Sequence, residues 1–198
     1  MYGLVREQDV NVYIFMSVEF PSTPSQREAM PPWLVAELRS DHAGETGAVY
    51  IYRGILKTSR HAEVIRFAKS HLKTEERHLA LITRELAKEH GSALLPLWKL
   101  AGFLTGAIPA MCGKNAVYAT IEAVETFVDG HYKQQIDKLG EMQGFLHLRT
   151  LLEQCREDEI AHRDEARKAV RNRSLMLRFW CWLIQAGSRV SVNLAKWV

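Results

Sequence analysis

The sequence has few cysteines and no paired cysteine motif. Its three cysteines, Cys112, Cys155 and Cys181, lie far apart, and none belongs to a Cys-x-x-Cys pair. This pattern argues against a disulfide scaffold or a zinc knuckle, so a reducing compartment is expected. We expect each cysteine to act as a small buried apolar side chain.

Signals for nucleotide binding, for targeting and for strands are also absent or nearly absent. No glycine-rich nucleotide fingerprint is visible. No basic segment precedes a long apolar core near the N-terminus, so we expect no secretory signal, and Glu7, Asp9 and Glu19 argue against a mitochondrial transit peptide. Strand-like patterns are nearly absent, apart from residues 10–15, which could form a short strand or an ordered arm. Residues 1–32 are therefore left as an unassigned N-terminal arm.

The chain has the length and composition of one folded domain, which we place at residues 33–198. The chain has 198 residues, of which 47% are hydrophobic and 25% charged, and it is long enough to bury a full core. The net charge of +3 is unevenly distributed, because eight Lys or Arg face only Asp164 and Glu165 in residues 163–198. A basic C-terminal segment on a mildly acidic body suggests an anionic surface as a partner.

Four long segments carry the periodicity of amphipathic helices. Apolar residues recur at alternating spacings of three and four, which places them on one face of a helix. The segments are residues 38–56, 65–86, 118–139 and 148–169. This pattern predicts an all-α fold, a four-helix bundle.

Each of these stripes contains a glutamate where the pattern asks for an apolar side chain. These are Glu45, Glu75, Glu125 and Glu159. A buried, unpaired carboxylate costs several kcal/mol or takes up a proton, and four of them around one axis would also repel one another. Two divalent cations would remove both costs. Oxygen ligands with one imidazole per metal suit iron or manganese better than ions that prefer thiolates.

The order of these residues repeats along the chain. His78 lies three residues after Glu75, and His162 lies three after Glu159, so each histidine shares a helix face with its glutamate. Ferritin-like di-iron and di-manganese carboxylate proteins use such a set of glutamates and Glu-x-x-His pairs. The predicted metal ligands are Glu45, Glu75, His78, Glu125, Glu159 and His162. Glu76 and Glu122 remain alternatives to Glu75 and Glu125, or belong to the solvated face or to the residues that support the ligands.

Residues beside the predicted ligands could orient them. Asp158 and Arg77 could hold an imidazole in one tautomer across the bundle, or could form an ordinary surface ion pair. His42 lies one turn before Glu45, and His131 starts the turn after Glu125; each could support the ligands or be a hydrogen-bonded core histidine. Tyr132 lies in a stripe and could support a ligand or be plain core.

Two segments outside the four stripes are rich in apolar and aromatic residues. Residues 93–112 are apolar except for Lys99 and Thr105, but their prolines and glycines argue against an uninterrupted spanning helix. Residues 175–198 mix tryptophan with arginine, a combination favoured at a lipid headgroup interface. We expect both segments to be helical and to lie at a membrane interface. The alternative is that they pack on the bundle or form a dimer interface.

Several motifs resemble the demethoxyubiquinone monooxygenase family of ubiquinone biosynthesis, over about residues 33–198. The motifs are residues 38–45 (LRSDHAGE), residues 95–103 (LPLWKLAGF), residues 123–125 (AVE) with 131–132 (HY), and residues 184–190 (IQAGSRV). The resemblance implies a membrane-associated di-iron enzyme that hydroxylates the ring of demethoxyubiquinol. The family's ligands fall on the six residues chosen above from spacing, and we expect Glu75 and Glu159 to bridge the two metals.

The same resemblance implies two iron ions per chain, O2 as co-substrate and reducing equivalents ultimately from NADH. Electrons would arrive through the quinol or a partner. The expected partners are membrane lipid, a polyprenyl quinol and other proteins of ubiquinone biosynthesis, and a homo-oligomer is admissible; no nucleic acid is expected. In a bacterium the expected location is peripheral, on the cytoplasmic face of the inner membrane. The alternatives are another ferritin-like activity, such as a ferroxidase or a hydroxylase of a different substrate, and a metal-free helical adaptor.

Overall fold

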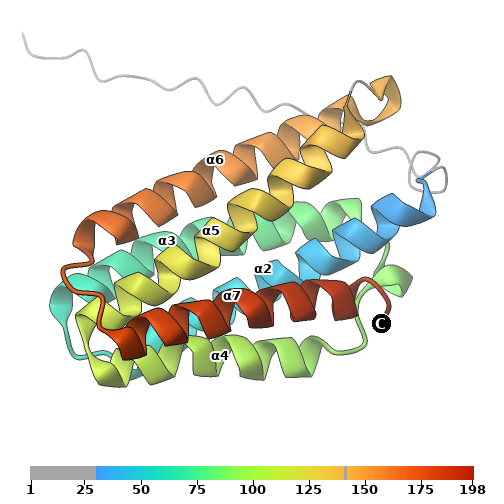
Figure 1. The fold of residues 1–198 in the computed structure, drawn as a ribbon. Coiled ribbons are helices and arrows are strands. Elements are labelled where there is room, and N and C mark those ends of the chain that lie inside the picture. The colour runs from blue at the N-terminus through green and yellow to red at the C-terminus, as the bar shows by residue number, and fades with distance from the viewer. Residues whose placement is uncertain (1–29, 141) are drawn as a thin grey trace, which may run out of the picture.

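The computed structural model describes residues 30–140 and 142–198, and over these residues the chain contains helices and no strands (Figure 1). The expected strand or arm at residues 10–15 lies outside the described residues. The helices are α2 (Pro32–Thr58), α3 (Ala62–Glu85), α4 (Leu95–Cys112), α5 (Lys114–Leu139), α6 (Leu146–Ala169) and α7 (Leu175–Ala195), with short 3-10 turns η1 (Lys88–His90) and η2 (Gln143–Phe145).

Four of these helices form the predicted bundle. The four periodic segments correspond to α2, α3, α5 and α6, so the predicted all-α bundle is confirmed. α2 packs against α3, α5 packs against α6, and α3 contacts α6. The two added helices both cover the side formed by α2 and α5: α4 packs on α2 and α5, and α7 packs on α5 and α2 (Figure 1).

Local sequence signals explain several helix ends. α2 begins at Pro32, where a proline loses no helical hydrogen bond. A single residue, Gly113, joins α4 to α5 with a φ of 108°, a left-handed conformation that glycine tolerates. Ser174 caps α7 by accepting a hydrogen bond from the Leu177 backbone N–H.

The core consists of two apolar clusters separated by the glutamates. One cluster contains residues such as Tyr52, Phe67 and Ile121, and the other contains residues such as Leu38 and Leu152. Along each of α2, α3, α5 and α6, the helix contributes to one cluster before its glutamate and to the other after it. The apolar stripes therefore support a polar layer in the middle of the bundle.

α4 differs from the expected interrupted segment. It is a continuous helix with Pro109 inside it, and by length and apolar composition it could cross a membrane, although a third of that stretch is buried on the bundle. Gly102 and Gly106 explain the close packing, because a Cβ on either would clash with the backbone of α2 at Gly47 or Ile51. Pro96 lies in the first turn, where a proline loses no helical hydrogen bond, whereas Pro109 lies inside the helix and removes one backbone hydrogen bond.

α4 and α7 each leave an apolar face exposed. The exposed apolar residues are Leu97, Leu100, Leu104, Ile108 and Met111 on α4, and Leu175, Met176, Phe179, Trp182, Leu183, Val190 and Leu194 on α7. The expectation that every cysteine is buried is wrong for Cys112, which is exposed, because it ends α4 beside the exposed Met111. Cys155 is buried and Cys181 is intermediate.

Candidate metal centre

The four bundle helices bring the six predicted ligands together in the buried polar layer. α2 contributes Glu45, and α5 contributes Glu125. α3 and α6 each contribute a Glu-x-x-His pair, which is Glu75 with His78 and Glu159 with His162. None of the six is more than 7% exposed. The periodicity explains this convergence, because each ligand replaces an apolar residue of the stripe that faces the bundle axis.

The ligand atoms fall into two overlapping groups. One group contains Glu45, Glu75, His78 and Glu159, and the other contains Glu75, Glu125, Glu159 and His162. Within each group, one ligand atom from each residue lies within 4.8 Å of all the others. Glu75 and Glu159 belong to both groups, so each could supply oxygens to two metal positions.

Several of these buried atoms have no hydrogen-bond partner in the described structure. They are one oxygen each of Glu45, Glu75 and Glu159, and the Nδ1 atom of His162. The His162 Nδ1 atom lies 3.1 Å from Glu75 Oε1 and 3.4 Å from Glu159 Oε2, but the angles do not satisfy a hydrogen bond. Buried polar atoms normally find partners, and atoms that converge without pairing fit ligands of a cation. The residues present therefore fit a metal pair.

Without metal, the cluster holds protons in place of cations. Burial raises the pKa of the carboxyls of Glu45, Glu75 and Glu125. Burial also opposes ionisation of Glu159, yet the neighbouring imidazoles of His162 and His78 lower its pKa to about 2.

The pKa values of the imidazoles of His78 and His162 are raised. Burial favours their neutral form, but the surrounding carboxylates, Glu159 foremost, raise the pKa of His78 to about 10 and that of His162 to about 9. Metal ligands must be deprotonated, so cations entering this site would displace protons.

Two tyrosines donate to the two outer glutamates. The Tyr132 hydroxyl donates a hydrogen bond to Glu45, and the Tyr52 hydroxyl donates to Glu125 Oε1 at 3.3 Å. Tyr132 is therefore more than plain core. Sequence reasoning missed the role of Tyr52, although Tyr52 and Tyr132 each lie seven residues after their own helix's glutamate. This shared spacing of seven residues was the sequence signal that could have predicted the role of Tyr52.

The pair Asp158 and Arg77 lies where a ligand-orienting pair was expected. Asp158 Oδ2 accepts from His78 Nε2 at 3.0 Å and from the Arg77 guanidinium. His78 Nδ1 then faces Glu159 Oε1 at 2.9 Å and Glu45 Oε2 at 3.8 Å. The carboxylate can hold a proton on Nε2 and so leave the Nδ1 lone pair directed into the centre.

His131 and His42 are placed differently. His131 Nε2 lies 3.0 Å from Asp41 Oδ1 and 2.8 Å from Gln135 Nε2, beside Tyr132. Gln135 also donates to Asp41, and sequence reasoning did not single out either residue. The His42 ring is only partly buried, and in the described structure its Nδ1 atom has no hydrogen-bond partner. Burial lowers the pKa of His42.

The two alternative glutamates lie outside the cluster. Glu76 is exposed and pairs with Arg53 at 3.0 Å. Glu122 pairs with Arg167 at 3.0 Å and with Arg173, which ties the segment before α7 to α5. The structure thus brings Glu75 and Glu125, rather than Glu76 and Glu122, into the buried cluster of candidate ligands.

One further histidine near the centre was not identified from the sequence. The buried His71 ring lies 3.9 Å, between centroids, from the ring of His162. Its Nε2 bonds to Glu165 Oε2 at 2.9 Å, and its Nδ1 lies 3.4 Å from the Tyr52 hydroxyl. Nothing in its spacing distinguishes it from an ordinary core residue of α3.

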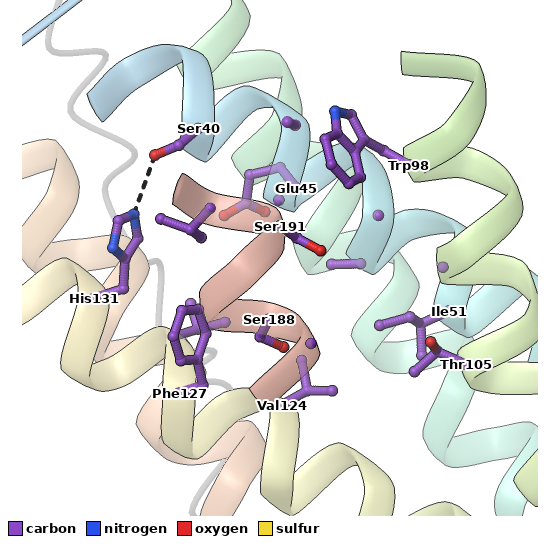
Figure 2. A pocket seen from close by; sticks show the side chains of 18 of the residues that line it. Ser40, Glu45, Ile51, Trp98, Thr105, Val124, Phe127, His131, Ser188 and Ser191 are labelled. Carbon is purple, nitrogen blue, oxygen red and sulfur yellow. Dashed lines mark hydrogen bonds between the residues drawn. The ribbon is translucent and has the colours of Figure 1, made fainter. Parts of the chain in front are cut away.

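A cavity of about 280 Å³ connects the added helices to the carboxylates. Figure 2 shows its wall: Ser40 and Ile51 come from α2, Trp98 and Thr105 from α4, Val124 and His131 from α5, and Ser188 and Ser191 from α7. Glu45, Glu75, Glu125 and Glu159 also line it. Most of the wall is apolar or small, so the cavity suits an apolar molecule that must approach the polar cluster.

Known proteins share this sequence pattern. A family model described as ubiquinone biosynthesis protein COQ7 matches residues 32–195. A 3-demethoxyubiquinol 3-hydroxylase of Rhodospirillum rubrum is 40% identical over 130 residues, which cover 64% of this chain and 60% of that protein's length. A mitochondrial NADPH-dependent 3-demethoxyubiquinone 3-hydroxylase of Rattus norvegicus is 30% identical over 163 residues, covering 80% of this chain and 75% of that protein. A mitochondrial 5-demethoxyubiquinone hydroxylase of Saccharomyces cerevisiae is 31% identical over 165 residues, covering 75% of this chain and 71% of that protein.

Proposed function

The chain belongs to the family of ubiquinone biosynthesis protein COQ7, and on that premise we propose that it is a di-iron monooxygenase that hydroxylates the ring of 3-demethoxyubiquinol with O2. The observation that carries the proposal is the buried cluster of four glutamates and two histidines at the end of an apolar cavity. The names of the bacterial and mitochondrial relatives support this reaction over a ferroxidase or another hydroxylase.

The proposed ligands divide into outer and shared residues. Glu45 and Glu125 would each serve one metal position with His78 or His162, and Glu75 and Glu159 would serve both. A pair of ferrous ions would supply the electrons that let triplet dioxygen react with a closed-shell ring. The hydroxyls of Tyr132 and Tyr52 hold the outer carboxylates in place.

The cavity wall would hold the substrate ring and exclude water. Val124, Phe127 and Val128 of α5 line the cavity together with small residues of α7, such as Gly187 and Ser188. A polyprenyl chain leaves a bilayer at a cost of about 0.8 kcal/mol per methylene, so the quinol ring has to reach the metals while its tail stays in lipid. α4 and α7 each have an exposed apolar face, and other residues of the same two helices line the cavity, which supports such a route.

We further propose that the protein is peripheral to a membrane, on the cytoplasmic face of the inner membrane in a bacterial cell. The reductant would be a reduced nicotinamide nucleotide acting through the quinol or a partner protein. We expected NADH, whereas the rat relative is named as NADPH-dependent. Other proteins of ubiquinone biosynthesis and a second copy of the chain remain the proposed protein partners.

Complementation tests the proposed reaction. A host that lacks its own demethoxyubiquinol hydroxylase accumulates the demethoxy precursor, and expression of this chain should restore ubiquinone. Glu159→Ala and His162→Ala should not restore it, because each removes a proposed ligand. The products are measured by chromatography and mass spectrometry of extracted quinones. Iron content of the purified chain is measured in parallel and should approach two ions per chain.

Glu153→Ala is the matched control, because Glu153 lies on the same helix but forms only a surface pair with Arg149. It should restore ubiquinone as the wild type does. Restoration by Glu159→Ala would contradict the ligand assignment. Failure of an expressed, iron-loaded wild-type chain would point to a different ring substrate.

A further inference from the structure

The bundle contains an internal repeat that is symmetric around the outer glutamates. Glu45 and Glu125 lie 80 residues apart, and so do Tyr52 and Tyr132. The hydrogen bonds cross over, because Tyr132 donates to Glu45 and Tyr52 donates to Glu125. Each half of the centre thus receives one hydroxyl from the other half, and in this respect the two metal positions are alike.

The two halves of the repeat differ in the residues beside the ligand histidines. His78 and His162 lie 84 residues apart, as do Glu75 and Glu159. The same offset places Thr74 at the position that corresponds to Asp158. Asp158 accepts a hydrogen bond from His78 Nε2, whereas no side chain in the described structure bonds to His162 Nε2.

The arginine that pairs with Asp158 also has no counterpart in the other half of the repeat. Arg77, which anchors Asp158, corresponds by the same offset to Ala161. The first repeat therefore contributes the arginine and the second contributes the aspartate, and together they build one carboxylate–histidine pair rather than two. That pair serves His78.

His162 is held by ring packing instead. The ring of His71 lies 3.9 Å from it between centroids, and His71 is itself fixed by Glu165 at 2.9 Å. By the repeat, His71 corresponds to Cys155, so this contact too occurs in only one half. Ring packing orients an imidazole, but it does not increase the electron density on the ligating nitrogen as a hydrogen bond to a carboxylate does.

We propose that the two metal positions are inequivalent, and that Asp158 makes the His78 position bind its metal first and at least about tenfold more tightly than the His162 position. This inference rests on the proposed metal centre. Asp158 is a positioning residue here: it acts through His78 and is not itself a ligand. The weaker position, beside His162 and Glu125, is the one from which metal is lost first.

Anaerobic calorimetry with ferrous ion tests this directly on the metal-free full chain. The wild type should bind two ions in two separate steps, the first at least about tenfold tighter. His162→Ala should keep one ion with the tight affinity, and His78→Ala should keep one with the weak affinity. Asp158→Asn should weaken the first step about 10- to 100-fold and bring the two steps together.

Asp137→Asn is the matched control, because Asp137 forms only an exposed pair with Lys133, and it should leave both steps unchanged. Circular dichroism checks that each variant is folded; if Asp158→Asn is not, the two histidine variants decide. Two equal steps in the wild type, or a tight step lost in His162→Ala and kept in His78→Ala, would overturn the inference. A folded wild-type chain that binds no iron would instead overturn the metal centre itself.

Discussion

At the scale of single residues, the candidate metal centre depends on the side chains that donate hydrogen bonds to its buried carboxylates. Glu45 and Glu125 are nearly inaccessible to water, and each has a tyrosine hydroxyl directed at it. Removing the donor alone leaves a buried acceptor unpaired, which costs about 1–3 kcal/mol, whereas replacing both partners by apolar groups can be nearly neutral. The two tyrosines therefore stabilise the bundle as well as orient the proposed ligands.

Removal of these hydroxyls should be measurable in the metal-free protein. Tyr132→Phe should lower the free energy of unfolding by about 1–3 kcal/mol, because Glu45 then lacks its donor. Tyr52→Phe should have a smaller effect in the same direction, since its bond to Glu125 is longer, at 3.3 Å. Urea denaturation measures both. Tyr50→Phe is the control: its ring contacts Arg53 and Lys99, and phenylalanine keeps those contacts. An equal loss in Tyr50→Phe would contradict the hydrogen-bond explanation.

At the scale of elements, α4 decides the shape of the cavity. Its glycines let its backbone pack directly on α2, and nearby side chains of the same helix, such as Trp98 and Thr105, form one wall. A helix this apolar could also cross a membrane by composition, but here it is seated on the bundle. Small residues at the contact make this possible, because a close backbone approach leaves no room for a Cβ.

A methyl group at this contact should force the two helices apart. Gly106→Ala should lower the free energy of unfolding by about 1–3 kcal/mol, because the added Cβ meets the Ile51 backbone, which cannot rotate away as a side chain can. Gly130→Ala provides a control of opposite sign. Gly130 lies inside α5 with open space around its Cβ position, so alanine should stabilise the helix by about 0.5–1 kcal/mol. Denaturant unfolding of both variants checks this, and a stabilising Gly106→Ala would rule out the tight contact.

At the scale of the whole molecule, the apolar surface gathers on the helices that cover α2 and α5. Phe179 and Trp182 on α7 are 63% and 59% exposed, and they stack on each other. Arginines of the C-terminal segment accompany them along the chain. An apolar face with nearby basic residues suits the surface of an anionic bilayer, and the cavity wall begins on the same helices.

Binding to lipid vesicles should depend on this face. The wild type should float with vesicles that contain anionic phospholipid, and the double variant Phe179→Glu/Trp182→Glu should bind at least about tenfold more weakly, since each buried aromatic contributes about 1.5–3 kcal/mol. Leu146→Glu is the matched control, because Leu146 is equally exposed, at 63%, but lies on α6. Flotation and sedimentation measure the bound fraction. Equal binding by the double variant and the wild type would exclude α7 as the docking face.

Much of the fold and of the centre follows from the pattern of the sequence. The spacing of three and four assigns α2, α3, α5 and α6, because a helix must bury one stripe to be stable in a bundle. A glutamate in such a stripe has to face the axis, so Glu45, Glu75, Glu125 and Glu159 were predictable as a cluster. Glu75 was distinguishable from Glu76 by its place in the stripe and by its spacing of three residues from His78, and the structure places Glu76 in a surface ion pair.

The partners of these residues were decided by the tertiary structure. Periodicity states which face a residue occupies, but not which side chain from another helix meets it. The contacts Tyr52 to Glu125, His71 to His162 and Asp158 to His78 therefore depend on how the helices are aligned along the bundle axis. The same reason applies to α4, whose continuous path through Pro109 depends on its packing against α2. Local spacing selects the residues of the centre, and long-range packing determines how each one is held.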